Sequence, residues 1–149
     1  MTVSLRGWQK NSWLVAHKSS PEEIAALLAI VERDLANAKV AGLADDWRLS
    51  IAYNAALQAA TAALASSGFR AAREQHHYRT SQSLPLTIGW PAAKVERFDR
   101  FRKKRNIGGY ETAGVVSERE AREMHDLAVG LRDDVLAWLR KQHPKLLTR

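Results

Sequence analysis

Residues 47–65 read WRLSIAYNAALQAATAALA, a run in which alanine is the commonest side chain and neither proline nor glycine occurs. Alanine has the highest helix propensity of any residue, so the run is predicted to be helical until Ser66-Ser67-Gly68 ends it. One face also carries larger side chains, and it comprises Leu49, Tyr53, Ala56, Leu57, Ala60 and Leu64. Small side chains let neighbouring helices approach closely, so we expect a central helix, with Asp45 or Asp46 as its N-cap.

Capping signals predict a helix on each side of this central one. Ser20-Pro21-Glu22-Glu23 is a capping box with proline at the first helical position, and an apolar stripe of helical spacing runs from there to near Gly42. Ser117-Glu118-Arg119-Glu120 repeats the capping pattern and opens a long helix that ends at His143-Pro144. Each of the two helices has one apolar stripe, so each is expected to bury one face and expose the other.

The region between residues 69 and 109 is predicted to hold two more helices. We expect a short helix over 78–88, in which Pro85 can introduce a kink, and another over 92–106, before Gly108-Gly109. No segment alternates apolar and polar residues as a half-buried strand would. The fold class is therefore predicted to be all-α, an up-and-down bundle of about five helices.

The length of 149 residues is typical of one domain with its own core. Residues 1–149 are therefore expected to form a single helical domain. Residues 1–20 are expected to be an N-terminal arm that packs on the bundle through Trp8 and Trp13.

Composition excludes several kinds of site. The chain has no cysteine, which excludes disulfides, Fe–S clusters and thiol nucleophiles and fits a reducing, cytoplasmic compartment. Its histidines do not occur at metal-ligand spacing, so we expect no metal and no cofactor. The longest apolar run, Ile24 to Val31, is too short to cross a membrane, so no membrane partner is expected.

The chain is strongly basic, with a formal net charge of +7 and a pI of about 10.1. Cationic groups displace the counterions condensed on phosphates, so this balance favours RNA or DNA as a partner. Many basic proteins use the same charge for solubility alone. A DNA-binding regulator is disfavoured, because no convincing helix-turn-helix is present.

The basic run from Arg97 to Tyr110 is the most informative part of the sequence. Successive residues of a helix are rotated by about 100°, so Arg105 lies on the same side as Phe98 and Phe101, whereas most of the other cations point elsewhere. An arginine in phase with two aromatic residues is not placed like a routine surface charge. It either pairs with a buried acid, which would make it structural, or faces a cleft or a partner chain.

The sequence resembles the HEPN-domain family, small helical proteins common in prokaryotic toxin–antitoxin and defence systems. The residues that carry the resemblance are Asp46-Trp47-Arg48, Tyr53-Asn54-Ala55-Ala56, His76-His77-Tyr78-Arg79-Thr80, and Arg105-Asn106 followed by Tyr110. The resemblance runs from Pro21 to Pro144. It implies a HEPN-like bundle, a homodimer and RNA cleavage that needs no metal.

Active members of this family carry an arginine, then commonly a polar residue, and a few positions later a histidine. By this resemblance Arg105 supplies the arginine and Asn106 the polar position, but Tyr110 stands where the histidine is expected. A phenol with an ordinary pKa of about 10 transfers protons poorly at neutral pH. Activity would therefore need cations that lower the pKa of this phenol, or a substitute imidazole such as that of His77.

Two functions follow as competing predictions. The first is an RNA-binding protein that acts as a metal-independent endoribonuclease, with the catalytic candidates Arg105, Asn106, Tyr110 and His77. Its nucleic-acid-binding candidates are Arg102, Lys103, Lys104 and Arg79. The second is a non-catalytic HEPN-like module that forms a homodimer or binds a protein partner such as an antitoxin.

Overall fold

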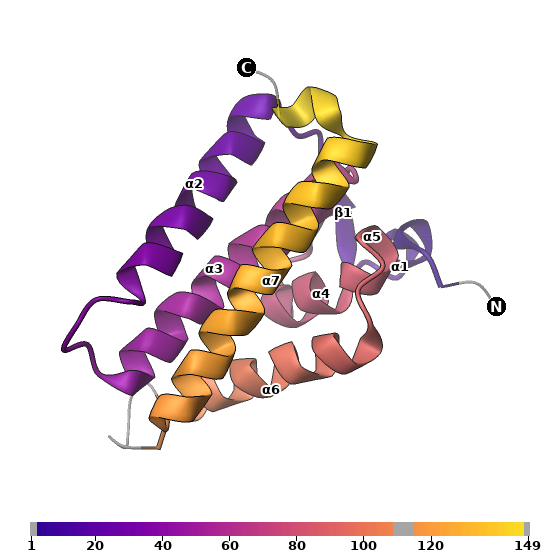
Figure 1. Ribbon diagram of the computed structural model, residues 1–149. Helices are drawn as coiled ribbons and strands as arrows, with labels where there is room; N and C mark the ends of the chain where they lie inside the picture. The colour runs from indigo at the N-terminus through magenta and orange to yellow at the C-terminus, as the bar shows by residue number, and fades with distance from the viewer. Residues whose placement is uncertain (1–2, 109–114, 148–149) are drawn as a thin grey trace.

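Three long helices form the body of the molecule in the computed structural model, which describes residues 3–108 and 115–147, without the side chains of 106–108. They are α2 (Pro21–Asn37), α3 (Asp45–Ser66) and α7 (Glu118–Gln142). α3 packs along both of the others, as Figure 1 shows. The predicted all-α helical bundle is confirmed.

The alanine-rich helix α3 occupies the central position that its sequence predicts. From Ala55 to Ser66 every residue is buried except Gln58 and Thr61, which are half-buried. A helix buried on nearly all sides needs small side chains wherever another backbone approaches it closely. Gly68 follows the helix with φ +96°, a left-handed conformation that glycine adopts without strain.

Of the three predicted N-caps, the two serine caps are present and the aspartate cap is not. The Ser20 side chain accepts from the Glu23 amide, and Ser117 and Glu120 form a complete capping box. The prediction that Asp45 or Asp46 caps α3 is wrong, because Ala44 occupies the N-cap position and makes no side-chain bond. Both aspartates instead lie in the first turn, where negative charge complements the helix dipole.

The segment predicted as one kinked helix is two helices. α4 (His76–Gln82) starts two residues earlier than expected, and α5 (Leu84–Thr87) carries Pro85 in its first turn, where a missing amide hydrogen costs nothing. α6 (Ala92–Gly108) then crosses one end of the bundle, against α3 and α4 (Figure 1). This crossing brings the basic run of α6 beside the histidines of α4.

The N-terminal arm packs on the bundle, and it contains a strand that the sequence did not predict. α1 (Leu5–Lys10) precedes β1 (Leu14–Ala16), which pairs antiparallel with β2 (Phe69–Ala71). Strands of three residues are too short to display a period of two, so the sequence pattern could not indicate them. The rings of Trp8 and Trp13 meet edge to face, with their centres 5.5 Å apart.

The last described element is a short 3-10 helix, η1 (Pro144–Leu147), which packs against α2 and α7. No helix within residues 3–108 and 115–147 combines the length and the apolar character needed to span a bilayer.

Candidate nucleic-acid interface

Arg105 lies at the end of the apolar face of α6, as its spacing predicts. Phe98 is fully buried and Phe101 is 7% exposed, and one turn later the half-buried Arg105 continues the same face. Its guanidinium carbon Cζ lies 5.2 Å from the centre of the Tyr53 ring. None of the ion pairs found among the described residues includes Arg105. The interpretation of Arg105 as half of an internal ion pair therefore finds no support in this part of the chain.

Tyr53 forms the floor below this guanidinium. Its side chain comes from α3, is 1% exposed, and packs its ring 5.3 Å from that of Phe98 and 6.3 Å from that of His77. The hydroxyl makes no hydrogen bond within the described structure. Burial raises the pKa of Tyr53 to about 12, although the charges of Arg102 and Arg105 act in the opposite direction. The phenol therefore stays protonated at neutral pH and keeps a hydrogen to donate.

His77 places an imidazole beside the same two arginines. Partial burial lowers the pKa of His77 below its usual 6.5, and the positive charges of Arg105 and Arg102 and the neighbouring His76 lower it further. At neutral pH the ring is therefore uncharged and can accept a proton. The geometry thus supplies an imidazole near Arg105 from another helix.

An open groove of about 550 Å³ lies between the start of α4 and Arg102 of α6. It is lined by Gln75, His76, His77, Tyr78 and Arg102. Gln75 has φ 55°, a left-handed conformation that is unfavourable for a residue with a side chain. Such backbone strain is common at functional sites, and here it lies directly before the two histidines.

Cations and aromatic rings alternate in and beside this groove, which Arg102 and Tyr78 line and which Arg79 and Arg105 adjoin. The guanidinium carbon of Arg102 lies 5.5 Å from the centre of the Tyr78 ring, and that of Arg79 lies 5.4 Å from the same ring. Asp99 orients Arg102, because its Oδ1 accepts from Arg102 Nε at 2.7 Å. The guanidinium carbon of Arg79 also lies 3.7 Å from the centre of the Trp13 ring, and this contact joins the N-terminal arm to the site. Interleaved cations and aromatic rings are typical of surfaces that bind single-stranded nucleic acid.

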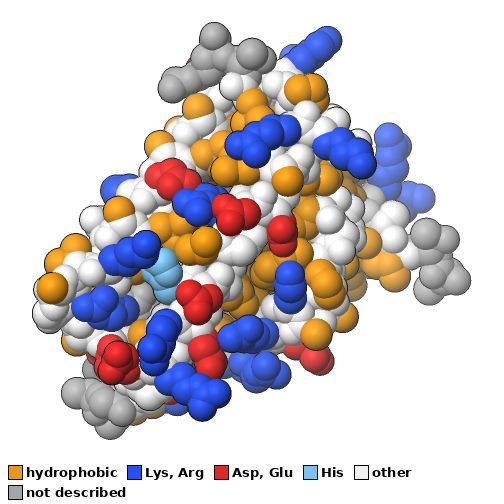
Figure 2. Space-filling model, viewed as in Figure 1, with side chains coloured by type: hydrophobic (Ala, Val, Ile, Leu, Met, Phe, Trp, Pro, Cys, Tyr) orange, Lys and Arg blue, Asp and Glu red, His pale blue; other side chains and the backbone are white. Residues whose placement is uncertain are grey.

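The remaining two predicted phosphate ligands, Lys103 and Lys104, lie on another side of α6. Lys104 Nζ is 3.3 Å from Glu120 of α7, and Lys103 Nζ is 3.6 Å from Asp99. Both lysines line a second groove of about 420 Å³ on the side of α6 toward α7. Figure 2 shows basic and acidic side chains interspersed over the face that carries α7, rather than one continuous basic patch.

Two predicted catalytic residues cannot be placed. Tyr110 lies outside the described residues, as does the side chain of Asn106. Two residues of the site are absent from the predicted set. The helical stripe of the central helix indicates a core position for Tyr53, and no prediction includes Asp99. The spacing of Asp99 three residues before Arg102 is the signal that could have indicated their ion pair.

Comparison with known proteins identified no relative: no family model, no curated protein and no solved structure matches the chain. The HEPN resemblance therefore stays a prediction. Within the described ranges, no three histidine or acidic side chains gather as metal ligands would.

The arrangement brings together three chemical capacities. Arg105 and Arg102 supply positive charge for a phosphate, His77 supplies a neutral imidazole, and Tyr78 supplies a ring on which a base can stack. The groups come from α4 and α6, which α3 holds against each other through Tyr53 and its neighbours.

Proposed function

We propose that this chain is a HEPN-like RNA-binding protein that cleaves RNA, without a metal ion, in the groove between α4 and α6. The observation that carries the proposal is the position of Arg105, which has no carboxylate partner among the described residues and lies close enough to His77 to lower the pKa of its imidazole. Buried and half-buried arginines are normally paired, so this guanidinium is available to an external anion.

RNA binding uses the row of cations and rings along the groove. Arg102 and Arg105 bind phosphate oxygens, while Tyr78 and the exposed His76 offer rings on which bases stack. Single-stranded RNA suits this groove better than a duplex, because bases in a duplex are not free to stack on protein side chains.

Cleavage uses the 2′-hydroxyl of the RNA as nucleophile. His77 takes the proton of this hydroxyl, the 2′-oxygen forms a bond to phosphorus, and the bond from phosphorus to the 5′-oxygen breaks. The departing 5′-oxygen takes a proton from water or from a protonated His76, whose ring centre is 6.0 Å from that of His77. Arg105 and Arg102 stabilise the extra negative charge on the phosphate. The products are a 2′,3′-cyclic phosphate end and a 5′-hydroxyl end.

The test incubates the purified chain in EDTA with a labelled single-stranded RNA and follows both binding and product ends. We expect His77→Gln to reduce the cleavage rate by about 100-fold or more while RNA affinity changes little. Arg105→Ala is expected to reduce both quantities, because this guanidinium contacts the phosphate before and during the reaction.

Arg100→Ala is the matched control on the same helix. Arg100 is exposed and lines the groove toward α7, so its loss removes one charge without touching the proposed site. If Arg105→Ala and Arg100→Ala behave alike, the groove between α4 and α6 is not the binding site. If the wild-type chain binds no RNA, the alternative of a non-catalytic interaction module is favoured.

The same proposal includes a cytoplasmic location, for which the absence of cysteine is the support, and a homodimer, which the HEPN resemblance implies. An antitoxin is the protein partner that the resemblance suggests. Light scattering of the purified chain measures its mass in solution, and a mass of one chain at micromolar concentration would contradict the dimer.

A further inference from the structure

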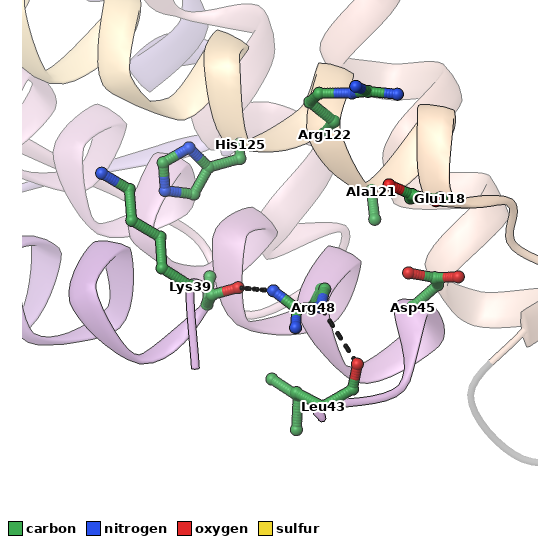
Figure 3. Close-up of a pocket in the computed structure, with 9 residues that line it drawn as sticks. Lys39, Leu43, Asp45, Arg48, Glu118, Ala121, Arg122 and His125 are labelled. Atoms are coloured by element: carbon green, nitrogen blue, oxygen red, sulfur yellow. Dashed lines mark hydrogen bonds between the residues drawn. The ribbon is translucent and has the colours of Figure 1, made fainter. Parts of the chain in front are cut away.

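A second pocket, of about 450 Å³, lies where the end of α2 meets the starts of α3 and α7, away from the groove between α4 and α6. Its charged lining residues are Lys39, Asp45, Arg48, Glu118 and Arg122, with the imidazole of His125 (Figure 3). This volume lies in the range that small organic ligands occupy.

Three cations of this pocket make no ion pair with a described acidic residue. None of the ion pairs found among the described residues includes Lys39, Arg48 or Arg122. Elsewhere on α7 the situation differs, since Arg119 is paired with Glu123 at 3.0 Å. Against the two carboxylates of Asp45 and Glu118, these three cations leave the lining with a surplus of positive charge, which favours an anion.

Arg48 is fixed in place by the backbone. Its Nε, Nη1 and Nη2 atoms donate to the carbonyl oxygens of Leu43, Ala38 and Val40 at 3.0, 2.9 and 2.6 Å. A guanidinium carries five N–H groups, so these three bonds leave donors for a ligand. Because its geometry is already set, binding at this arginine costs little conformational entropy.

The charged groups of the pocket are unevenly distributed, as Figure 3 shows. Lys39 and His125 lie at one end, Asp45 and Glu118 lie together at the other, and Arg48 lies between them. The His125 ring uses Nε2 for a 3.2 Å hydrogen bond to the Leu35 carbonyl oxygen, which fixes its orientation. Carboxylates accept hydrogen bonds from hydroxyl groups, whereas the cationic end and Arg48 suit phosphate oxygens.

We infer that this pocket binds a small phosphate ester that carries hydroxyl groups, of the size of a sugar phosphate or a nucleoside monophosphate. The phosphate lies against Lys39 and Arg48, and the hydroxyls donate to Asp45 and Glu118 at the other end of the pocket, where Arg122 also lies. The site is separate from the proposed RNA groove and does not depend on it.

The test is calorimetric titration of the full chain with four probes, namely sodium phosphate, ribose 5-phosphate, adenosine 5′-monophosphate and adenosine. We expect the two esters to bind with Kd below about 1 mM, inorganic phosphate to bind more weakly and adenosine not to bind. The preference between the two esters distinguishes a sugar phosphate from a nucleotide.

Two double variants with the same change of charge give the control. Lys39→Gln with Arg122→Gln is expected to weaken ester binding by about tenfold or more, whereas Arg119→Gln with Arg140→Gln, on exposed positions of α7, is expected to leave it unchanged. Asp45→Asn with Glu118→Gln is expected to weaken the esters more than inorganic phosphate. The inference is overturned if neither ester binds, if both cation variants lose affinity equally, or if a short RNA competes with the ester.

Discussion

Tyr53 shows how a single buried hydroxyl connects the core to the proposed site. The phenol is buried between α3, α4 and α6, its hydroxyl has no hydrogen-bond partner in the described structure, and its ring lies under the guanidinium of Arg105. A buried hydroxyl without a partner costs about 1–3 kcal/mol of stability. Phenylalanine would keep the packing of the ring, so this cost can be measured by removing one oxygen.

We therefore expect Tyr53→Phe to stabilise the fold by about 1 kcal/mol at neutral pH, as measured by urea denaturation. The variant should also change the response to alkali. Burial raises the pKa of Tyr53 from 10.0 to about 12, so between these values the unfolded phenol ionises while the folded one stays protonated. The stability of the wild type is thus reduced as pH rises through this window, and part of that loss should disappear in the variant.

Tyr78→Phe is the control for this experiment, because Tyr78 is half-buried and its loss leaves the phenol of Tyr53 in place. It should retain the alkaline loss of stability. A Tyr53→Phe variant that is less stable than the wild type at neutral pH would mean that the hydroxyl has a bonding partner.

At the scale of elements, the sequence predicts the start of a helix best where a capping side chain bonds to a backbone amide of the same turn. Ser20 and Ser117 cap α2 and α7 as expected, because both caps depend on residues within one turn. The paired strands β1 and β2 and the split between α4 and α5 were missed. The strands are held by pairing between segments more than fifty residues apart in sequence, which no local pattern records.

The connection between α2 and α3 depends on one long-range side chain, that of Arg48. Its guanidinium serves three carbonyl oxygens after the last turn of α2, of which that of Val40 also accepts from the Leu43 amide at 3.4 Å. We expect Arg48→Ala to lower the free energy of unfolding by about 2 kcal/mol, since three hydrogen bonds from a charged donor are lost in a partly buried loop.

Urea denaturation measures this effect, and Arg122→Ala serves as its control. Arg122 faces the same pocket, is exposed, and has no ion pair among the described residues, so its loss should change stability by less than about 0.5 kcal/mol. Equal destabilisation by the two variants would show that charge in the pocket, rather than the hydrogen bonds of Arg48, supports the loop.

At the scale of the whole molecule, the sequence predicts the orientation of Arg105 but not its neighbours. Helical phase places this arginine in line with Phe98 and Phe101, and the structure agrees. The approach of His77 depends on how α6 crosses the bundle, which is a property of tertiary packing. The ion pair of Lys104 with Glu120 was unpredictable for the same reason, since it joins two helices, whereas Lys103 pairs with Asp99 four residues earlier on α6, a spacing that the sequence records.

An RNA in the groove would therefore contact fewer cations than the net charge of +7 suggests. Each phosphate contact contributes about −0.7 to the slope of log K against log salt for a single strand, so contacts by Arg79, Arg102 and Arg105 predict a slope near −2.

We expect Arg105→Ala to reduce the magnitude of that slope by about 0.7, as measured by RNA titrations at several salt concentrations. Lys104→Ala should leave the slope nearly unchanged, because this lysine faces α7 rather than the groove. A slope much steeper than −2, equally reduced by both variants, would mean that RNA contacts the basic surface as a whole and that the groove between α4 and α6 has no special role.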